Sequence, residues 1–234
     1  MSVSRRSASR RSASRRHNGG NRAVVIGLGR FGGSLALELV TGRTEVLALD
    51  HREKVVNEWA DRLTHAAVVD CTDEQALRQL DVHNFPRAVV AIGAELESSI
   101  LATSILAEFG VPRIWAKALS RQHARILERV GAHHVVLPEH DMGERVAHLV
   151  MGRMLDYIEF EDDYAMVKTL APEEAVGRPL GQSQLRHRYG VTVVSIKRRG
   201  EGFTYASSET VVQRGDLLIV AGRTADTERF AELS

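Results

Sequence analysis

The sequence predicts an α/β protein in which a doubly wound parallel sheet is followed by a small α+β domain. Six short apolar runs alternate with helical patterns, a glycine-rich turn follows the first run, and the chain becomes strand-rich after residue 157. Strands that alternate with helices are typical of a parallel sheet covered on both faces, and these three observations therefore set the predicted fold class.

The predicted strands of the first part are short apolar runs, as expected for strands that are buried on both faces. They lie at 23–26, 45–50, 66–69, 88–92, 113–116 and 134–137. Amphipathic stretches separate them, and these predict helices at 31–40, 52–62, 73–80, 96–109 and 121–130. Pro112 and Gly131 each follow one of these stretches, which is typical of helix ends.

A different pattern begins at Met142. A helix predicted over 142–155 has one apolar stripe, formed by Met142, Val146, Leu149, Val150, Met154 and Leu155. We place the domain boundary near 157–163. Beyond it, the sequence predicts strands at 164–170, 191–197 and 216–220, and a closing helix at 224–233. The expected division is a tail over 1–20, a Rossmann-like sheet domain over 21–141, a helix and linker over 142–160, and a small second domain over 161–234.

The composition is that of a globular protein, with 26% charged residues. A single cysteine, Cys71, excludes an intrachain disulfide and fits a reducing, cytoplasmic setting. No apolar run approaches the roughly 18–20 residues of a membrane helix, so we expect no membrane-spanning helix. Residues 1–20 contain six of the 31 basic residues and no acid, which leaves 25 basic against 30 acidic residues elsewhere. A mildly acidic body does not favour nucleic-acid binding.

The first twenty residues repeat Ser-Arg-Arg-Ser-Ala and contain almost nothing that could be buried, so we expect them to be disordered. They lack the apolar core of a signal peptide. One interpretation is a loose basic extension, or a start codon placed too far upstream. The other is a tail attracted to anionic lipid or nucleic acid.

The turn Gly27-Leu-Gly-Arg-Phe-Gly32 is a G-x-G-x-x-G motif between a predicted strand and a predicted helix. Asp50 closes the next predicted strand, 21 residues after Gly29. In this context the motif predicts a dinucleotide or nucleotide site, with phosphate at the helix N-terminus and the acid on the ribose. Asp50 would repel a 2′-phosphate and so disfavours NADP. NADP stays an alternative because the positively charged Arg52 is nearby.

Arg30 lies inside the phosphate loop. A guanidinium there can bind phosphate in a bidentate manner, which a pyrophosphate on a helix N-terminus does not require. The Arg30 guanidinium could instead bind a third phosphate, or a phosphate held by a neighbouring subunit. The alternative is a solvated arginine.

The sequence argues against an enzyme. It contains no H-E-x-x-H, no G-x-S-x-G and no cysteine pair. Cys71 has no basic neighbour that would lower its pKa, so we interpret it as lining a pocket. His133 and His134 would point to opposite faces of a strand, and His187 lies in a basic stretch that reads as solvated surface. An NAD-dependent oxidoreductase remains the alternative.

Further motifs lie in order along the chain. They are Ala-Val-Val-Ile-Gly-Leu-Gly-Arg-Phe-Gly-Gly-Ser at 23–34, Val-Val-Ala-Ile-Gly-Ala at 89–94, Ile-Trp-Ala-Lys-Ala at 114–118, Leu-Glu-Arg-Val-Gly-Ala at 127–132, Pro-Glu-His-Asp-Met-Gly at 138–143, Tyr-Gly-Val-Thr-Val-Val-Ser-Ile-Lys at 189–197 and Gly-Asp-Leu-Leu-Ile-Val-Ala-Gly at 215–222. Together they resemble the RCK (regulator of potassium conductance) domain subunits of Ktr/Trk potassium transporters, most of all the KtrA type. The resemblance covers residues 22–234.

This resemblance implies an RCK N domain, an RCK C ligand domain and an assembly. Subunits would form homodimers through the helix over 142–155, and four dimers would form an octameric ring. That ring would bind a membrane potassium-translocating subunit at the cytoplasmic face of the membrane. ATP and ADP would favour different ring shapes and so gate potassium entry. An NAD(H)-sensing Trk-type regulator is a related alternative.

The resemblance also implies the roles of individual residues. The phosphates would lie against Gly27, Leu28, Gly29, Arg30, Phe31 and Gly32, with Lys117 and His123 nearby; the ribose against Asp50, His51 and Arg52; the adenine against Asp70, Cys71 and Thr72; and Gly93 and Ala94 would form the floor. Arg30 would reach the terminal phosphate of the nucleotide in the paired subunit. Arg52, Glu95 and Leu119 depart from the polar pattern that the family leads us to expect.

Two further ligands are implied. Glu139 would lie near the γ-phosphate at the dimer interface, where it could help to hold Mg²⁺ or Ca²⁺ with phosphate and water oxygens. The alternative for Glu139 is a first-turn acid that favours the helix dipole. In the RCK C domain, cyclic di-AMP could bind, with Arg186, His187, Arg188 and Tyr189 as candidate contacts.

Overall fold

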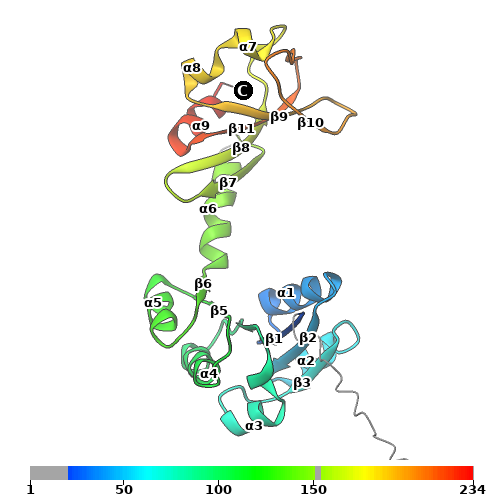
Figure 1. Ribbon diagram of the computed structural model, residues 1–234, viewed down its shortest axis with the longest axis vertical. Coiled ribbons are helices and arrows are strands. Elements are labelled where there is room, and N and C mark those ends of the chain that lie inside the picture. Colours follow the sequence, from blue (N-terminus) through cyan, green and yellow to red (C-terminus); the bar gives the residue numbers. More distant parts are fainter. Residues whose placement is uncertain (1–20, 151–153, 234) are drawn as a thin grey trace, which may run out of the picture. The chain divides into compact units, whose positions relative to one another are not determined.

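The computed structural model describes residues 21–150 and 154–233, so the predicted tail lies outside the described residues. The chain divides into two compact units, Met1–Pro138 and Glu139–Ser234 (Figure 1). Each unit is described by itself below. Among the described residues, no helix combines the length and apolarity needed to cross a membrane.

The first unit contains a six-stranded parallel sheet, as predicted. Its strands are β1 (Arg22–Ile26), β2 (Glu45–Asp50), β3 (His65–Val68), β4 (Ala88–Val90), β5 (Ile114–Lys117) and β6 (His134–Val136). The order across the sheet is β3-β2-β1-β4-β5-β6. The order therefore reverses between β1 and β4, which is the doubly wound arrangement in which ligands bind at the carboxyl ends of the strands.

Helices follow the strands within a few residues of the predicted bounds. They are α1 (Arg30–Thr41), α2 (Glu53–Trp59), α3 (Glu74–Gln79), α4 (Leu96–Glu108) and α5 (Arg121–Arg129), with a 3₁₀ turn η1 (Val82–Asn84). Alternate residues of β1 face two apolar clusters: Val25 packs with Ala36 of α1, whereas Val24 packs with Leu77 and Leu106 of α3 and α4. The sheet is therefore buried on both faces, which explains why its strands are short apolar runs.

The second unit begins with α6 (Pro138–Val150) and continues with a five-stranded antiparallel sheet of order β10-β9-β11-β8-β7. Its strands are β7 (Asp156–Phe160), β8 (Tyr164–Leu170), β9 (Thr192–Lys197), β10 (Phe203–Tyr205) and β11 (Leu217–Arg223). The helical elements are η2 (Glu173–Ala175), α7 (Leu180–Ser183), α8 (Leu185–Tyr189) and α9 (Thr224–Ala231). Phe230 of α9 is fully buried in a cluster with Val167, Leu218 and Val220 of the sheet.

Two boundaries differ from the prediction. The helix expected over 142–155 begins four residues earlier, at Pro138, whose fixed φ and missing N–H suit a first helical turn. Met154 and Leu155, which were predicted on its apolar stripe, are not helical, and Met154 is buried in the apolar cluster of the second sheet. Residues 156–160, expected in a linker, form β7 and pair with β8 through a tight turn in which Asp162 and Asp163 have positive φ. The second compact unit starts at Glu139 and therefore includes the helix and linker that were predicted to precede the second domain.

Candidate functional site

The carboxyl ends of β1 and β4 lie side by side, and the predicted site residues of the first unit gather at this edge of the sheet. Gly27 follows β1, Asp50 ends β2, Gly93 follows β4 and Lys117 ends β5. The structure therefore brings the predicted phosphate, ribose and floor residues of the first unit to one edge. Glu139 lies in α6, in the second unit.

The glycine turn has the geometry that a phosphate loop needs. Gly27 has a φ of +93°, and a Cβ there would lie 3.0 Å from the backbone of Ala91 and Ile92 at the end of β4. A Cβ on Gly32 would lie 1.9 Å from the carbonyl oxygen of Gly27, so α1 can start close to β1 only with glycine there. Beside Gly29, by contrast, a Cβ would meet nothing within 4 Å. The turn is thus tight toward the sheet and open at Gly29.

The N-terminus of α1 suits an anion. Gly29 is the N-cap and provides no side-chain hydrogen bond, and the first turn contains no acidic residue. The amides of that turn and the positive end of the helix dipole therefore favour a negatively charged group. Arg30, the first residue of α1, is exposed and adds a guanidinium at the same helix end.

Asp50 is buried, with 3% of its surface exposed, and its carboxylate is fully engaged. Oδ2 accepts hydrogen bonds from the amide of Leu28 at 2.8 Å and from Nη2 of Arg52 at 3.0 Å. Oδ1 accepts from the amide of Arg52 at 2.9 Å and from its Nε at 3.0 Å. Burial raises the pKa of Asp50, but the hydrogen bonds from Arg52 and Leu28 outweigh it and hold that pKa below its usual range. The ionised carboxylate thus links the phosphate loop to the end of β2.

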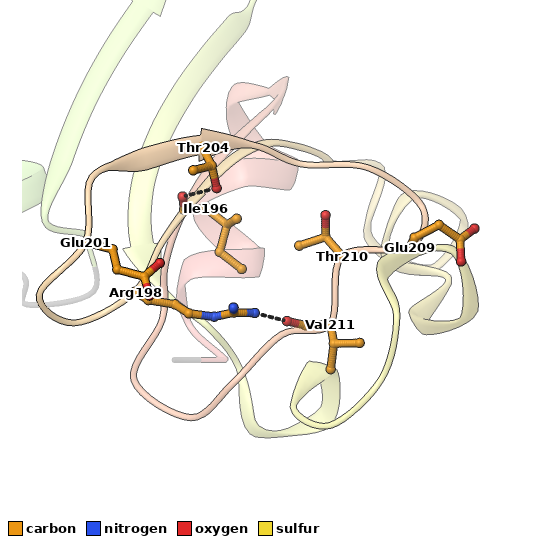
Figure 2. A pocket seen from close by; sticks show the side chains of 7 residues that line it. All are labelled: Ile196, Arg198, Glu201, Thr204, Glu209, Thr210 and Val211. Carbon is orange, nitrogen blue, oxygen red and sulfur yellow. Dashed lines mark hydrogen bonds between the residues drawn. The ribbon is translucent and has the colours of Figure 1, made fainter.

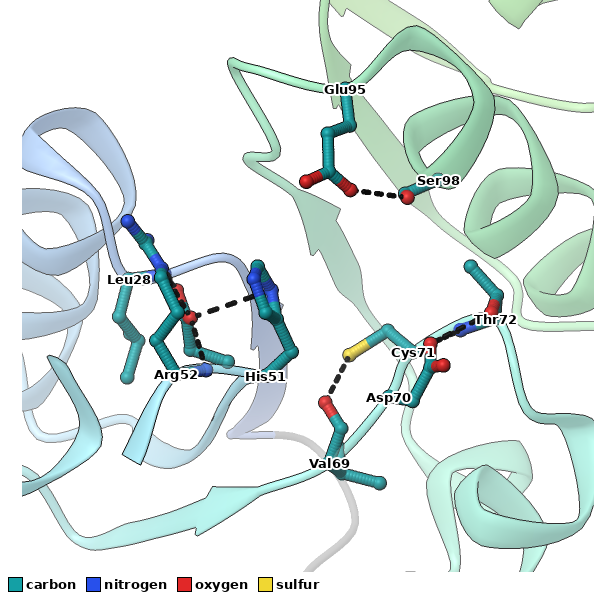
Figure 3. Close-up of polar contacts among 10 residues, drawn as sticks. Leu28, His51, Arg52, Val69, Asp70, Cys71, Thr72, Glu95 and Ser98 are labelled. Atoms are coloured by element: carbon teal, nitrogen blue, oxygen red, sulfur yellow. Dashed lines mark hydrogen bonds and ion pairs between the residues drawn. The ribbon is translucent and has the colours of Figure 1, made fainter. Parts of the chain in front are cut away.

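The loop after β3 provides one wall of the site (Figure 3). Asp70 Oδ1 accepts hydrogen bonds from Thr72, from the amide at 2.9 Å and from the hydroxyl at 2.7 Å. Burial raises the pKa of Cys71 to about 12, and its Sγ lies 3.8 Å from the carbonyl oxygen of Val69. Cys71 is therefore a neutral thiol that lines the wall.

The opposite side of the switch point comes from β4, β5 and their loops. Lys117 is buried, and its Nζ lies 5.7 Å from the ring centroid of Phe31 and 3.2 Å from where a Cβ on Gly93 would be. Glu95 precedes α4 and accepts a hydrogen bond from Ser98 at 2.8 Å. In Figure 3 Glu95 lies across from Arg52. Phe31, Gly93 and Lys117, which are far apart in sequence, thus converge.

His123 is buried at the start of α5, with 2% of its surface exposed. Its Nδ1 accepts a hydrogen bond from the amide of Leu119 at 3.3 Å, and within the described part of the chain its Nε2 has no hydrogen-bond partner. Burial lowers the pKa of His123, so the ring is neutral at pH 7 with its remaining N–H on Nε2. It is a buried donor, not a cationic phosphate ligand.

The second unit contains an open pocket of about 390 Å³ that the sequence did not indicate. Figure 2 shows its lining residues, Ile196, Arg198, Glu201, Thr204, Glu209, Thr210 and Val211. Arg198 donates to the carbonyl oxygen of Val211 at 2.9 Å. Two carboxylates and one guanidinium line this pocket, so it does not favour an anion. Nothing in the spacing of these residues could have revealed it.

The basic stretch of α8 is partly committed to structure. Arg188 donates to Glu174 at 2.6 Å and to the hydroxyl of Tyr189 at 2.9 Å, and Tyr189 packs edge-on against Phe230. Arg186 and His187 are exposed. In the described residues no group of three or more His, Cys, Asp or Glu side chains could hold a metal ion, so Glu139 by itself is at most one ligand.

Comparisons with known proteins agree with both units. A TrkA-N domain model matches residues 23–138 and a TrkA-C domain model matches residues 165–234. Ktr system potassium uptake protein C of Bacillus subtilis is 41% identical over 207 residues, which cover 88% of this chain and 94% of that protein. Ktr system potassium uptake protein A of Vibrio alginolyticus is 37% identical over 205 residues, 87% of this chain and 93% of that protein.

Solved structures agree with the fold. The GsuK channel bound to NAD superposes with a TM-score of 0.61 at 17% identity, over 91% of this chain and 39% of that chain. The TrkA-N domain of the Escherichia coli inner membrane protein YbaL superposes with a TM-score of 0.51 at 18% identity, over 56% of this chain and 96% of that chain. The two domain models and the close relatives together identify the chain as a member of the Ktr/Trk family of RCK-domain potassium uptake proteins.

Proposed function

We propose that this chain is a nucleotide-sensing regulatory subunit that binds ATP or ADP at the β1–β4 switch point and gates a membrane potassium transporter. The observation that carries the proposal is the phosphate loop, tight at Gly27 and Gly32 and open at Gly29, beside the ionised Asp50. Such a loop suits a phosphate at the helix N-terminus and a ribose on the acid. The potassium uptake role rests on the names of the close relatives.

The proposed role is binding without catalysis. Cys71, whose pKa is raised to about 12, cannot act as a nucleophile at neutral pH, and the buried ring of His123 is neutral. Neither residue is therefore poised for nucleophilic attack or for donation of a proton from an imidazolium. A bound nucleotide would act by its difference in affinity for two arrangements of the assembly.

The proposed assembly is a homodimer formed through α6, repeated into an octameric ring at the cytoplasmic face of the membrane. Arg30 of one subunit would contact the terminal phosphate of the partner's nucleotide, which distinguishes ATP from ADP. Glu139 would contribute one oxygen to a Mg²⁺ or Ca²⁺ ion shared with phosphate and water. Arg186 and His187 are the exposed residues available to an anionic second ligand such as cyclic di-AMP.

NAD is the competing ligand. A neighbouring GsuK structure contains NAD and another, with a TM-score of 0.50, contains ADP, each below 25% identity. Asp50 would accept a ribose hydroxyl from either ligand. The choice between them changes the signal that is sensed and not the regulatory role.

The test is to identify the ligand. Mass spectrometry of the denatured protein would identify any copurifying nucleotide, and calorimetry would compare ATP, ADP and NAD. We expect ATP and ADP to bind, NAD to bind more weakly, and no turnover of nicotinamide substrates. Binding of NAD alone would replace ATP and ADP as the signal, and turnover would favour an oxidoreductase. Failure of all three nucleotides to bind would overturn the proposal.

A further inference from the structure

The Asp50 carboxylate has no hydrogen-bonding capacity left over. A carboxylate offers about four lone-pair positions, two on each oxygen. The amides of Leu28 and Arg52 occupy one position on each oxygen, and the Arg52 guanidinium occupies the other two through Nε and Nη2. Backbone donors therefore fill half of the acceptor positions, and one side chain fills the other half.

These two halves differ in how readily they can be vacated. The amides of Leu28 and Arg52 belong to the loop and strand end, so their hydrogen bonds persist while the fold does. The Arg52 side chain is 52% exposed, whereas the side chain of Asp50 is 2% exposed. The negative charges of Glu95 and Glu58 also raise the pKa of Arg52, so the cation is favoured by carboxylates other than Asp50. The guanidinium is the donor that can leave.

We propose that Arg52 is a ribose-competing latch: its guanidinium occupies the acceptor positions that a nucleotide ribose needs, and it must swing away from Asp50 when the ribose binds. The proposal rests on the proposed nucleotide site. It reverses the role expected for Arg52, because a residue expected to hold the ribose instead opposes it. The apparent affinity then falls by the fraction of molecules in which the latch is closed.

The latch makes a prediction that distinguishes it from a general effect of charge. Removing Arg52 removes a positive charge, which lowers the affinity for every anionic nucleotide to a similar degree. Opening of the latch, however, is required only by a nucleotide that has ribose hydroxyls. ATP and 2′,3′-dideoxy-ATP carry the same phosphates and base, so the ratio of their affinities isolates the competition for Asp50.

The experiment compares the two nucleotides by calorimetry on the full chain, as wild type and as Arg52→Ala. We expect the preference for ATP over 2′,3′-dideoxy-ATP to increase roughly 3- to 10-fold in Arg52→Ala, in line with the strength of a half-exposed charged pair. Arg52→Lys, which keeps the charge and cannot make the bidentate contact, is the matched control and should increase the preference by a smaller factor. Thermal unfolding of each variant checks that the fold is retained.

The outcomes separate this inference from the proposed function. An unchanged or reduced preference in Arg52→Ala, with ATP still bound, would overturn the latch and leave the nucleotide site intact. An Arg52→Ala protein that fails to fold transfers the decision to Arg52→Lys, in which an unchanged preference also counts against the latch. If wild type and variants bind neither nucleotide, the proposed function fails and the latch fails with it.

Discussion

Gly29 is the residue at which the proposed nucleotide binding can be tested separately from folding. Its φ of −63° and ψ of −173° are open to any L-amino acid, and nothing lies within 4 Å of a Cβ placed there. Aspartate is a favourable N-cap, but it would put a negative charge where the phosphate of the proposed nucleotide would lie. We expect Gly29→Asp to keep or slightly raise the melting temperature. The same substitution should lower the affinity for ATP and ADP by about 10-fold or more, measured by calorimetry.

Gly29→Asn provides the control for this substitution. Asparagine has nearly the same shape and is also a good N-cap, but it carries no charge. It should therefore retain much more of the affinity than Gly29→Asp does. Equal losses in the two variants would point to steric exclusion, and no loss in either would place the phosphate elsewhere.

Cys71 should be almost unreactive in the folded protein. Burial disfavours the charged thiolate, and a pKa of about 12 leaves roughly one thiolate in ten thousand at pH 8. We expect a thiol reagent such as DTNB to modify Cys71 at least about 100-fold more slowly in the native protein than in denaturant. The thiolate fraction should rise with pH, and stability should fall as pH increases above the unfolded pKa, because the folded state disfavours ionisation. Equal rates in the two states would contradict the buried placement.

At this scale the sequence predicted which residues gather at the site better than how they bond. The position of Asp50 followed from the spacing between a glycine turn and the next strand end, which is a property of the doubly wound fold. The contact from Arg52 did not follow, because a side chain two residues beyond a strand end can turn in several directions. Its direction depends on the depth of Asp50 and on the amide of Leu28, which only the folded chain brings together.

Helix α6 is the element with the most to explain. None of its described residues is buried, and it carries an exposed apolar stripe. Met142, Val146 and Val150 on this stripe are 53%, 44% and 79% exposed. Under the proposed dimer, this stripe is covered by the partner subunit. We expect Val146→Asp to weaken self-association by about 10-fold or more, measured by sedimentation, because a charge would be buried without a partner.

Ala147→Asp is the matched control on the same helix. Ala147 is exposed and lies off the stripe, so the same charge should leave self-association within about twofold of wild type. If both variants dissociate equally, the loss comes from destabilised helix and not from the stripe. If Val146→Asp associates as wild type does, α6 is not the dimer contact.

Helices and strands were predictable where a single hydrophobic pattern dominates the segment. The strands of the first sheet are continuous apolar runs, and the structure confirms all six within a few residues. Strands β7 and β10 escaped prediction because they lie at the edges of the second sheet, where most side chains are exposed and no apolar run is needed. The start of α6 was also missed, because Pro138 and Glu139 are good first-turn residues but add nothing to the apolar stripe.

For the whole assembly, the decisive question is which subunit's Arg30 senses the terminal phosphate. Under the proposal, Arg30→Ala should bring the affinities for ATP and ADP close together, because only ATP provides the extra charged group. Coexpression with an Asp50→Ala chain, which we expect to bind all adenosine nucleotides weakly, gives mixed dimers. In these the intact nucleotide site of the Arg30→Ala chain faces an intact partner Arg30, so calorimetry should detect restored discrimination at half of the sites.

This mixed dimer also contains its own counter-test. Mixed dimers that discriminate no better than the Arg30→Ala homodimer would place Arg30 on the nucleotide of its own chain. Arg30→Ala homodimers that discriminate as well as wild type would remove the arginine from phosphate sensing altogether.

The apolar residues of the two units form separate clusters, and this has an evolutionary consequence. In the described residues, each unit buries apolar side chains in clusters of its own. Recombination near Pro138 could therefore replace the second unit by one from another protein without changing the glycine turn. Lineages could in this way acquire a different second unit while inheriting an unaltered glycine turn.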